Sequence, residues 1–198
     1  MNWLAHVVLS EPTIEFRLGN LLADLVRGEA RTRMPMEFLR GAECHKAIDA
    51  YTDAHPIVRA SWARIDARYR RFGGVLVDIF YDYCLAQRFE EYVNMPLAQF
   101  TQDFYTAVRA HPLPLPIDAR TTLDRIVAHD LLGRYARLDG VEDSLRRISI
   151  YLARKWGREF SLADAAAVLG EHEAAFAADF EAFFPQLQRH VAGLRTTR

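Results

Sequence analysis

The chain has 198 residues, a formal net charge of −1 and a hydrophobic fraction of 51%. This length and balance are typical of a globular domain with a core of its own, and the near-zero charge argues against a nonspecific nucleic-acid binder. The two cysteines form no CxxC pair, and no basic segment followed by a long apolar run opens the chain. We therefore expect a reducing, cytoplasmic setting and no membrane span.

Helical periodicity dominates the sequence, and no alternating strand signal is present. Capping residues, glycines and prolines divide the chain into about eight or nine helices. The expected helices cover approximately residues 2–9, 13–28, 35–53, 56–72, 75–92, 96–110, 118–135 and 141–156, followed by a last region after Ser161 that Pro185 should kink. The sequence thus predicts an all-α fold, a single helical-bundle domain over residues 1–198.

The helix expected over residues 35–53 carries an unusual polar face. His45, Asp49 and Asp53 follow one another at four-residue spacing and therefore lie on one side of a helix. This face has no lysine or arginine partner, and its nitrogen and oxygen atoms suit a divalent cation such as Mn²⁺, Mg²⁺ or Zn²⁺. Alternatively, Asp53 caps the turn before Pro56.

Four further residues on early helices add to this face. Asp78 and Asp82 lie one turn apart in the most apolar helix, where a carboxylate is costly unless it is paired or binds a metal. Each could instead bind a helix terminus or an arginine. His6 could be an ordinary buried histidine, and Asp24 could simply pair with Arg27, three residues on. Together they favour a common site.

The remaining histidines are expected to have no chemical role. His129 and Asp130 form the one adjacent His-Asp pair, which is the emblem of a large family of helical metal-dependent phosphohydrolases, but the flanking residues look like ordinary helix core. His55 is expected to start a helix. The others, which lack acidic companions at ligand spacing, are His111, His172 and His190.

Several blocks of the chain, in this order, resemble the acyl-carrier-protein phosphodiesterase family. They are residues 1–6 (MNWLAH), 19–28 (GNLLADLVRG), 45–56 (HKAIDAYTDAHP) and 78–82 (DIFYD), with looser similarity over 132–148. The resemblance implies hydrolysis of the phosphodiester that joins 4′-phosphopantetheine to the serine of acyl carrier protein. It also implies a helical fold like the HD phosphohydrolases, with non-standard ligand spacing, and a divalent metal, with Mn²⁺ ahead of Mg²⁺ or Zn²⁺.

Residue pattern and resemblance together predict the roles of the site residues. The predicted metal ligands are His6, Asp24, His45, Asp49 and Asp82, with Asp53 and Asp78 as further acids. Asp24, Asp49 and Asp78 are the carboxylates expected to take part in catalysis, and Arg27 is expected to clamp the substrate phosphate. Two alternatives stay open: a phosphohydrolase acting on a nucleotide or another small phosphoester, and a non-catalytic helical binding module.

A run of arginines follows the predicted metal helix. Arg59, Arg64, Arg68, Arg70 and Arg71 share the helix expected over residues 56–72, whereas the acids that could balance them lie near the C-terminus. Carrier proteins are acidic, so we expect Arg64, Arg68 and Arg71 to dock this partner, with no role for nucleic acid or a membrane. The alternative is a solvated charged face.

Overall fold

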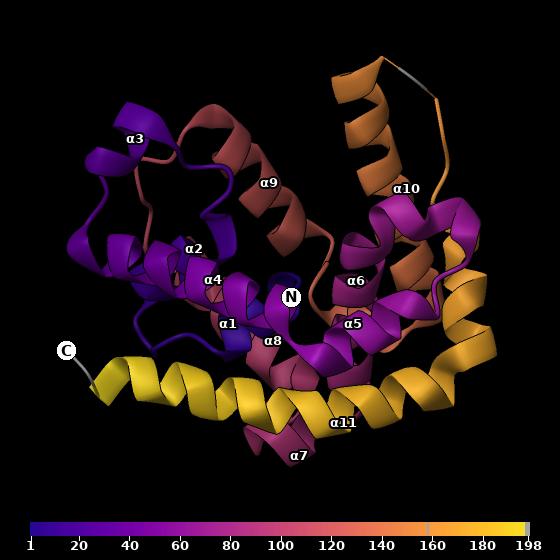
Figure 1. Ribbon diagram of the computed structural model, residues 1–198. Helices are drawn as coiled ribbons and strands as arrows, with labels where there is room; N and C mark the ends of the chain where they lie inside the picture. The colour runs from indigo at the N-terminus through magenta and orange to yellow at the C-terminus, as the bar shows by residue number, and fades with distance from the viewer. Residues whose placement is uncertain (158, 197–198) are drawn as a thin grey trace.

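The computed structural model describes residues 1–157 and 159–196, which form eleven α-helices, three short 3₁₀ helices and no strand (Figure 1). The α-helices are α1 (Trp3–Val8), α2 (Ile14–Leu22), α3 (Gly28–Thr32), α4 (Met36–Ala54), α5 (Pro56–Ala63), α6 (Gly73–Gln87), α7 (Phe89–Val93), α8 (Leu97–Ala110), α9 (Ile117–Ala128), α10 (Leu138–Trp156) and α11 (Ala166–Thr196). The 3₁₀ helices are η1 (Ala67–Phe72), η2 (Gly133–Ala136) and η3 (Ala163–Ala165). The all-α prediction is confirmed, and α3 is the one α-helix that lies outside the expected helical ranges.

Helix α6 forms the centre of the hydrophobic core. Its residues are apolar on nearly every side, which is the pattern of a helix surrounded by others. It packs against α1, α5, α10 and α11. Phe80 and Tyr81 meet Phe176 and Phe180 of α11 edge to face, with ring centroids 5.1 and 5.4 Å apart. Helix α11 lies across α4, α5 and α6 along the lower edge of Figure 1.

Two glycines allow α2 and α4 to pack backbone to backbone. A Cβ atom on Gly19 would lie 2.0 Å from the carbonyl oxygen of Phe38, and one on Gly41 would lie 2.1 Å from that of Phe16. No larger residue fits at either position without moving the helices apart. This contact keeps the residues that follow Gly19 on α2 close to the residues that follow Gly41 on α4.

The second helix ends earlier than its apolar pattern predicts. Helix α2 stops at Leu22, and Asp24 and Arg27 lie in the turns that follow. The side chain of Arg31 donates to the carbonyl oxygens of Ala23 and Val26. It therefore provides hydrogen-bond partners for backbone carbonyl groups that follow the end of α2. Gly28, with φ of +56°, then turns the chain into α3.

The arginines after the central helix do not share one helix. Helix α5 ends at Ala63, and η1 begins after Asp66, whose carboxylate accepts from the backbone N–H of Arg68 at 2.8 Å. This local cap starts a new turn with a different direction. The expectation of one continuous helix over residues 56–72 is therefore wrong.

Three later boundaries also differ from the expectation. The helix expected over 75–92 divides at Arg88 into α6 and α7, and that expected over 118–135 ends at Ala128, before a turn in which Asp130 has φ of +47°. Helix α11 is continuous at Pro185, and its non-helical residue is His172. None of the described helices has a stretch long and apolar enough to cross a bilayer.

Candidate metal centre

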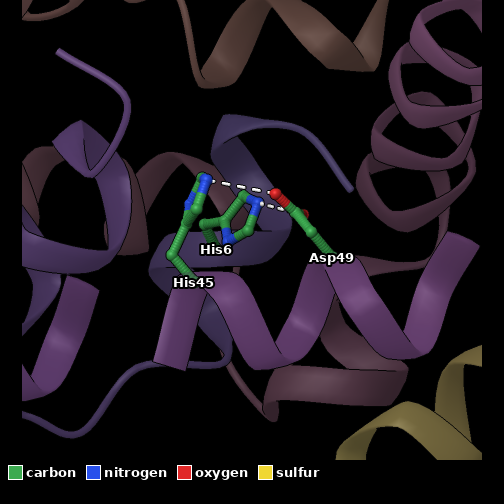
Figure 2. A group of neighbouring side chains, drawn as sticks. All are labelled: His6, His45 and Asp49. Carbon is green, nitrogen blue, oxygen red and sulfur yellow. Dashed lines mark ion pairs between the residues drawn. The ribbon is translucent and has the colours of Figure 1, made fainter. Parts of the chain in front are cut away.

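Three side chains from two helices converge on one point (Figure 2). His6 comes from α1, and His45 and Asp49 come from successive turns of α4. Nε2 of His6 lies 3.2 Å from Oδ1 of Asp49, and Nε2 of His45 lies 3.1 Å from Oδ2 of the same carboxylate. One nitrogen or oxygen atom from each residue lies within 4.8 Å of the others. The structure thus brings together three of the five predicted ligands in one group.

The position of His6 depends on how α1 begins. Asn2 caps the helix by accepting from the backbone N–H of Trp3. Asp82 of α6 accepts from the next two backbone N–H groups, those of Leu4 at 2.7 Å and Ala5 at 3.2 Å. A carboxylate at a helix N-terminus binds free N–H groups and interacts favourably with the helix dipole. Asp82 therefore holds α1, and with it His6, against the core.

Asn20 on α2 contacts both histidines. Its side-chain Oδ1 lies 2.8 Å from Nδ1 of His6, and its backbone oxygen lies 2.8 Å from Nδ1 of His45. Asn20 is fully buried. Its amide nitrogen donates to the backbone oxygen of His6 and to Oγ of Ser10, at 2.9 and 3.0 Å. The close packing of α2 on α4 brings this residue within reach of His45.

The atoms that face the centre suit a cation. Both Nε2 atoms and both Asp49 oxygens converge, and each can offer an electron pair. Nε2 of His45 is buried and has no aligned hydrogen-bond partner among the described residues, although it lies beside Asp49. Ligands about 2.0–2.2 Å from a metal are themselves about 3–4.4 Å apart, which fits these separations. Two imidazoles and a carboxylate form a donor set for a borderline divalent metal.

The electrostatics of the centre favour the charged carboxylate. Burial opposes ionisation of Asp49, but His45 and His6 hold its pKa well below the usual range. Burial alone would lower the pKa of His45, yet Asp24 and Asp49 raise it to about 9. Burial lowers the pKa of His6. The centre therefore carries one firmly ionised acid beside one basic and one neutral ring.

Asp24 and Arg27 lie at the solvent side of this centre. Oδ2 of Asp24 is 3.7 Å from Nε2 of His45, and its Oδ1 accepts from Arg27 at 3.0 Å. Both side chains are exposed, at 74% and 70%. The contact with His45 lowers the pKa of Asp24 to about 2. Asp24 therefore remains an anion close to the centre, and Arg27 offers an accessible guanidinium beside it.

The other predicted acids contact groups outside the His6–His45–Asp49 cluster or lie beyond it. Asp78 is 3.0 Å from the backbone nitrogen of Met1, which also lies 3.5 Å from Asp49. Asp53 is exposed one turn beyond Asp49, and burial together with Asp78 raises its pKa. Asp82 binds the start of α1 instead of facing the histidines. This contact is the helix-terminus alternative that the sequence left open for a buried acid.

Two of the histidines that were given no chemical role, His55 and His129, lie at helix ends. His55 is the N-cap of α5 and accepts from the backbone N–H of Ile57 at 3.3 Å. His129 is exposed at the end of α9, and Asp130 accepts from Tyr105 Oη at 2.9 Å and from the N–H of Gly133 at 3.2 Å. Both of these Asp130 contacts stabilise the turn after α9.

The predicted docking arginines have unequal surroundings. Arg64 pairs with Asp179 of α11, so an acid from the C-terminal region lies beside it. The expectation that all such acids lie far from these arginines is therefore wrong. Arg68 is 72% exposed and pairs with Asp66, and Arg71 lies over the ring of Trp156, 4.9 Å from its centroid. Arg64 links helices, whereas Arg68 and Arg71 belong to the surface.

Asn20 is a site residue that the sequence did not predict. An uncharged amide within an amphipathic helix has no ligand spacing to detect. Its one signal is position, because it interrupts the apolar residues Leu18, Leu21 and Leu22 on the face of α2 that is buried. A buried amide needs hydrogen-bond partners, which is a reason to expect a specific contact.

Comparisons with known proteins cover nearly the whole chain. A family model described as "Acyl carrier protein phosphodiesterase" matches residues 1–187. A protein of that name from Yersinia pestis is 29% identical over 192 residues, which cover 96% of this chain and 97% of the relative. One from Photorhabdus laumondii is 28% identical over 188 residues, with coverage of 94% and 93%. One from Yersinia enterocolitica is 30% identical over 148 residues, with coverage of 74% and 76%. No solved structure gives a significant match.

Proposed function

The chain belongs to the acyl carrier protein phosphodiesterase family, and we propose that its His6–His45–Asp49 centre binds the divalent cation that this reaction uses. Enzymes of this kind are phosphoric diester hydrolases acting on acyl carrier protein. The bond that we propose is cleaved joins 4′-phosphopantetheine to the carrier serine. The convergence of two imidazole nitrogens and two carboxylate oxygens on one point carries this proposal.

The donor set supports a cation of intermediate hardness. Imidazole suits Zn²⁺ and other transition metals, and carboxylate suits Mg²⁺ and Mn²⁺. We propose Mn²⁺ first, with Mg²⁺ or Zn²⁺ as alternatives. When bound, the cation would act as a Lewis acid on the phosphoryl group and lower the pKa of the attacking water.

The residues around the centre supply the other requirements of hydrolysis. Water adds to phosphorus, the bond from phosphorus to the serine oxygen breaks, and that oxygen takes up a proton. Asp24 lies beside His45, and Asp78 lies beside the Met1 nitrogen that also contacts Asp49, so either carboxylate can orient the water or accept its proton. Arg27 is exposed next to Asp24, so its planar guanidinium can bind two oxygens of the phosphoryl group as charge develops.

Recognition of the carrier requires a surface close to the centre, because the scissile phosphate is attached directly to the carrier serine. We propose that Arg68 and Arg71, exposed on η1, attract the acidic partner by electrostatic steering. Arg64, which the sequence placed with them, is engaged by Asp179 and contributes to the fold. We further propose that the enzyme works in the cytoplasm as one domain over residues 1–198.

A direct assay tests the function. The purified protein is incubated with holo-acyl carrier protein and Mn²⁺, and mass spectrometry follows loss of phosphopantetheine from the carrier. The expected result is the apo carrier and free 4′-phosphopantetheine, with no product after treatment with a chelator. Turnover of small phosphoesters but not of the carrier would favour a nucleotide-type phosphohydrolase. Absence of bound metal and of turnover on both substrates would favour a binding module.

A further inference from the structure

We infer that Asn20 is a positioning residue that sets the same ring tautomer in both histidines of the centre, through its side chain for His6 and through its backbone for His45. The inference rests on the proposed metal centre and concerns the hydrogen bonds beneath it. A histidine can bind a metal through Nε2 only when that atom has no proton, so the group that binds Nδ1 determines whether it is a competent ligand.

The orientation of the Asn20 amide follows from its neighbours. The backbone oxygen of His6 lies 2.9 Å from Nδ2 of Asn20 and can only accept. Ser10 donates its hydroxyl proton to that same backbone oxygen at 2.7 Å, so its Oγ is free to accept from Nδ2 at 3.0 Å. These two contacts use both protons of the amide nitrogen, which also lies 3.7 Å from Sγ of Cys44. The atom left to face the ring of His6 is the oxygen, Oδ1.

This orientation determines the tautomer of His6. Both ring nitrogens of His6 face acceptors, but Oδ1 of Asn20 lies 2.8 Å from Nδ1, whereas the acceptors at Nε2 lie 3.2 Å away. We therefore place the proton of the neutral ring on Nδ1, where the hydrogen bond is shorter. In the neutral ring, Nε2 then has an electron pair, and it faces Oδ1 of Asp49 and the backbone oxygen of Met1, each at 3.2 Å. Three acceptor atoms without a shared proton repel one another, and a cation between Nε2 and Asp49 removes that repulsion.

His45 reaches the same state through a different group. Its Nδ1 lies 2.8 Å from the backbone oxygen of Asn20, which can only accept, so Nδ1 again holds the proton. Nε2 of His45 is left beside Asp49 and Asp24. This second contact does not depend on the asparagine side chain. Replacing the side chain should therefore affect His6 alone, and this asymmetry is what makes the inference testable.

The test uses Asn20→Leu, which has similar size and no polar atom. In metal-free protein at a pH where the rings are neutral, long-range ¹⁵N–¹H NMR of labelled histidine reports which ring nitrogen holds the proton. In the variant, the His6 proton should move from Nδ1 to Nε2, where it can donate to Asp49 or to the Met1 backbone. His45 should keep its proton on Nδ1. Mn²⁺ affinity, measured by competition with a chelator, should fall about 10–100-fold.

Two further variants separate positioning from folding. Ser10→Ala removes one partner of the amide but leaves the Oδ1 contact with His6, so it should keep the tautomer of His6 while lowering Tm slightly. Asn20→Asp keeps an acceptor for Nδ1 and should restore that tautomer relative to Asn20→Leu. Far-ultraviolet circular dichroism checks that each variant is folded.

The His6 tautomer can also be measured in the wild-type protein, which tests the inference even if a variant does not fold. A His6 proton on Nε2 in the metal-free wild-type protein overturns it, as does an unchanged His6 tautomer in folded Asn20→Leu. The NMR result needs neither metal nor substrate. If the wild-type protein shows the expected tautomers but binds no Mn²⁺, the proposed function fails and the positioning role of Asn20 stands.

Discussion

His6 and His45 come from different helices, yet their imidazole rings are stacked, with centroids 4.2 Å apart and planes at 22°. Both rings direct Nε2 to the carboxylate of Asp49 (Figure 2). Stacked rings that each hold a positive charge would repel, and burial already keeps the pKa of His6 low. Asp49 is therefore the negative charge that both imidazole rings share.

Replacing Asp49 should abolish the centre without unfolding the chain. Asp49→Ala removes the only carboxylate that contacts both rings among the described residues, so Mn²⁺ binding should fall at least about 100-fold and carrier hydrolysis should be lost. The helical circular dichroism signal should persist. Glu43→Ala, an exposed change on the same helix, is the matched control and should leave both measurements unchanged. Normal activity in Asp49→Ala would mean that α4 is not the metal face.

Metal affinity should depend on pH through His45. The pKa of this residue is about 9 because Asp24 and Asp49 outweigh the effect of burial, so a cation must displace a proton at neutral pH. The apparent affinity for Mn²⁺ should rise about tenfold per pH unit between pH 7 and 8.5, measured by chelator competition. Asp24→Asn should lower this pKa and flatten the rise. A pH-independent affinity would show that His45 is not a ligand.

The same shift predicts the pH dependence of stability in metal-free protein. The pKa of His45 is higher in the folded chain than the ordinary histidine value of 6.5. The resulting stabilisation is fully present below about pH 6.5 and is lost as the pH rises through about 9. Tm in the presence of a chelator should therefore decrease over this range. His45→Gln should show a smaller decrease in the same thermal-unfolding series.

Arg27 should act on substrate and not on metal. Arg27→Lys keeps the positive charge but loses the planar pair of donors, so kcat/KM for holo-carrier protein should fall about tenfold or more. Mn²⁺ content should be unchanged because Arg27 contacts Asp24 on the side away from the histidines. Arg33→Lys, in an exposed pair with Glu29, is the control. If Arg27→Lys has wild-type kinetics, Arg27 forms an ion pair with Asp24 and does not bind the substrate phosphate.

Asp82 should prove to be a stabilising residue. Burial raises its pKa to about 7 against the opposing effect of the Leu4 and Ala5 N–H groups. Asp82→Leu leaves those two groups without an acceptor and should cost about 1–3 kcal/mol of unfolding free energy, measured by urea denaturation. Asp82→Asn keeps an acceptor oxygen for only one of the two N–H groups, so it should lose less stability than Asp82→Leu and should keep its Mn²⁺ content. If a stable Asp82→Asn protein loses its metal, Asp82 is a metal ligand, as the sequence predicted.

Carrier docking should respond to the exposed arginines. Replacing Arg68 and Arg71 with glutamate should raise KM for holo-carrier protein. A higher salt concentration should also raise this KM for the wild-type protein, because salt screens the attraction between charged surfaces. Hydrolysis of a small phosphodiester should be unaffected. Arg64→Glu is different, because it places an acid next to Asp179 and should lower Tm. If the double variant loses the same activity on both substrates, Arg68 and Arg71 stabilise the fold and do not dock the carrier.

Local signals explain which parts of the fold could be predicted. Helix α4 has Pro35 at its start and His55-Pro56 at its end, and its predicted limits agree with the structure within a residue or two. Helices α3 and α7 are five residues long, too short for a periodic pattern. The early end of α2 depends on the side chain of Arg31, which returns from beyond the helix. Such a contact has no signature in the residues of α2.

The site was predictable where it depends on one helix and not where it depends on packing. The spacing of His45 and Asp49 is sufficient to place both on one face of α4. Apolar surroundings indicated correctly that Asp82 is buried, but its partner is the start of α1, which only the tertiary fold brings near. His6 was included because it lies on an early helix, as the other candidate residues do. Its contact with Asn20 required the packing of α1 on α2.

The backbone contact of α2 with α4 at Gly19 and Gly41 has a consequence for how the centre can respond to an ion. With no side chain between the helices, there is no soft layer that could compress or swell. The distance between the Asn20 carbonyl and His45 is therefore set by main-chain atoms. For the proposed centre, this means that the hydrogen bond to Nδ1 of His45 has a rigid anchor, so a cation at Nε2 would meet a ring with little freedom to move.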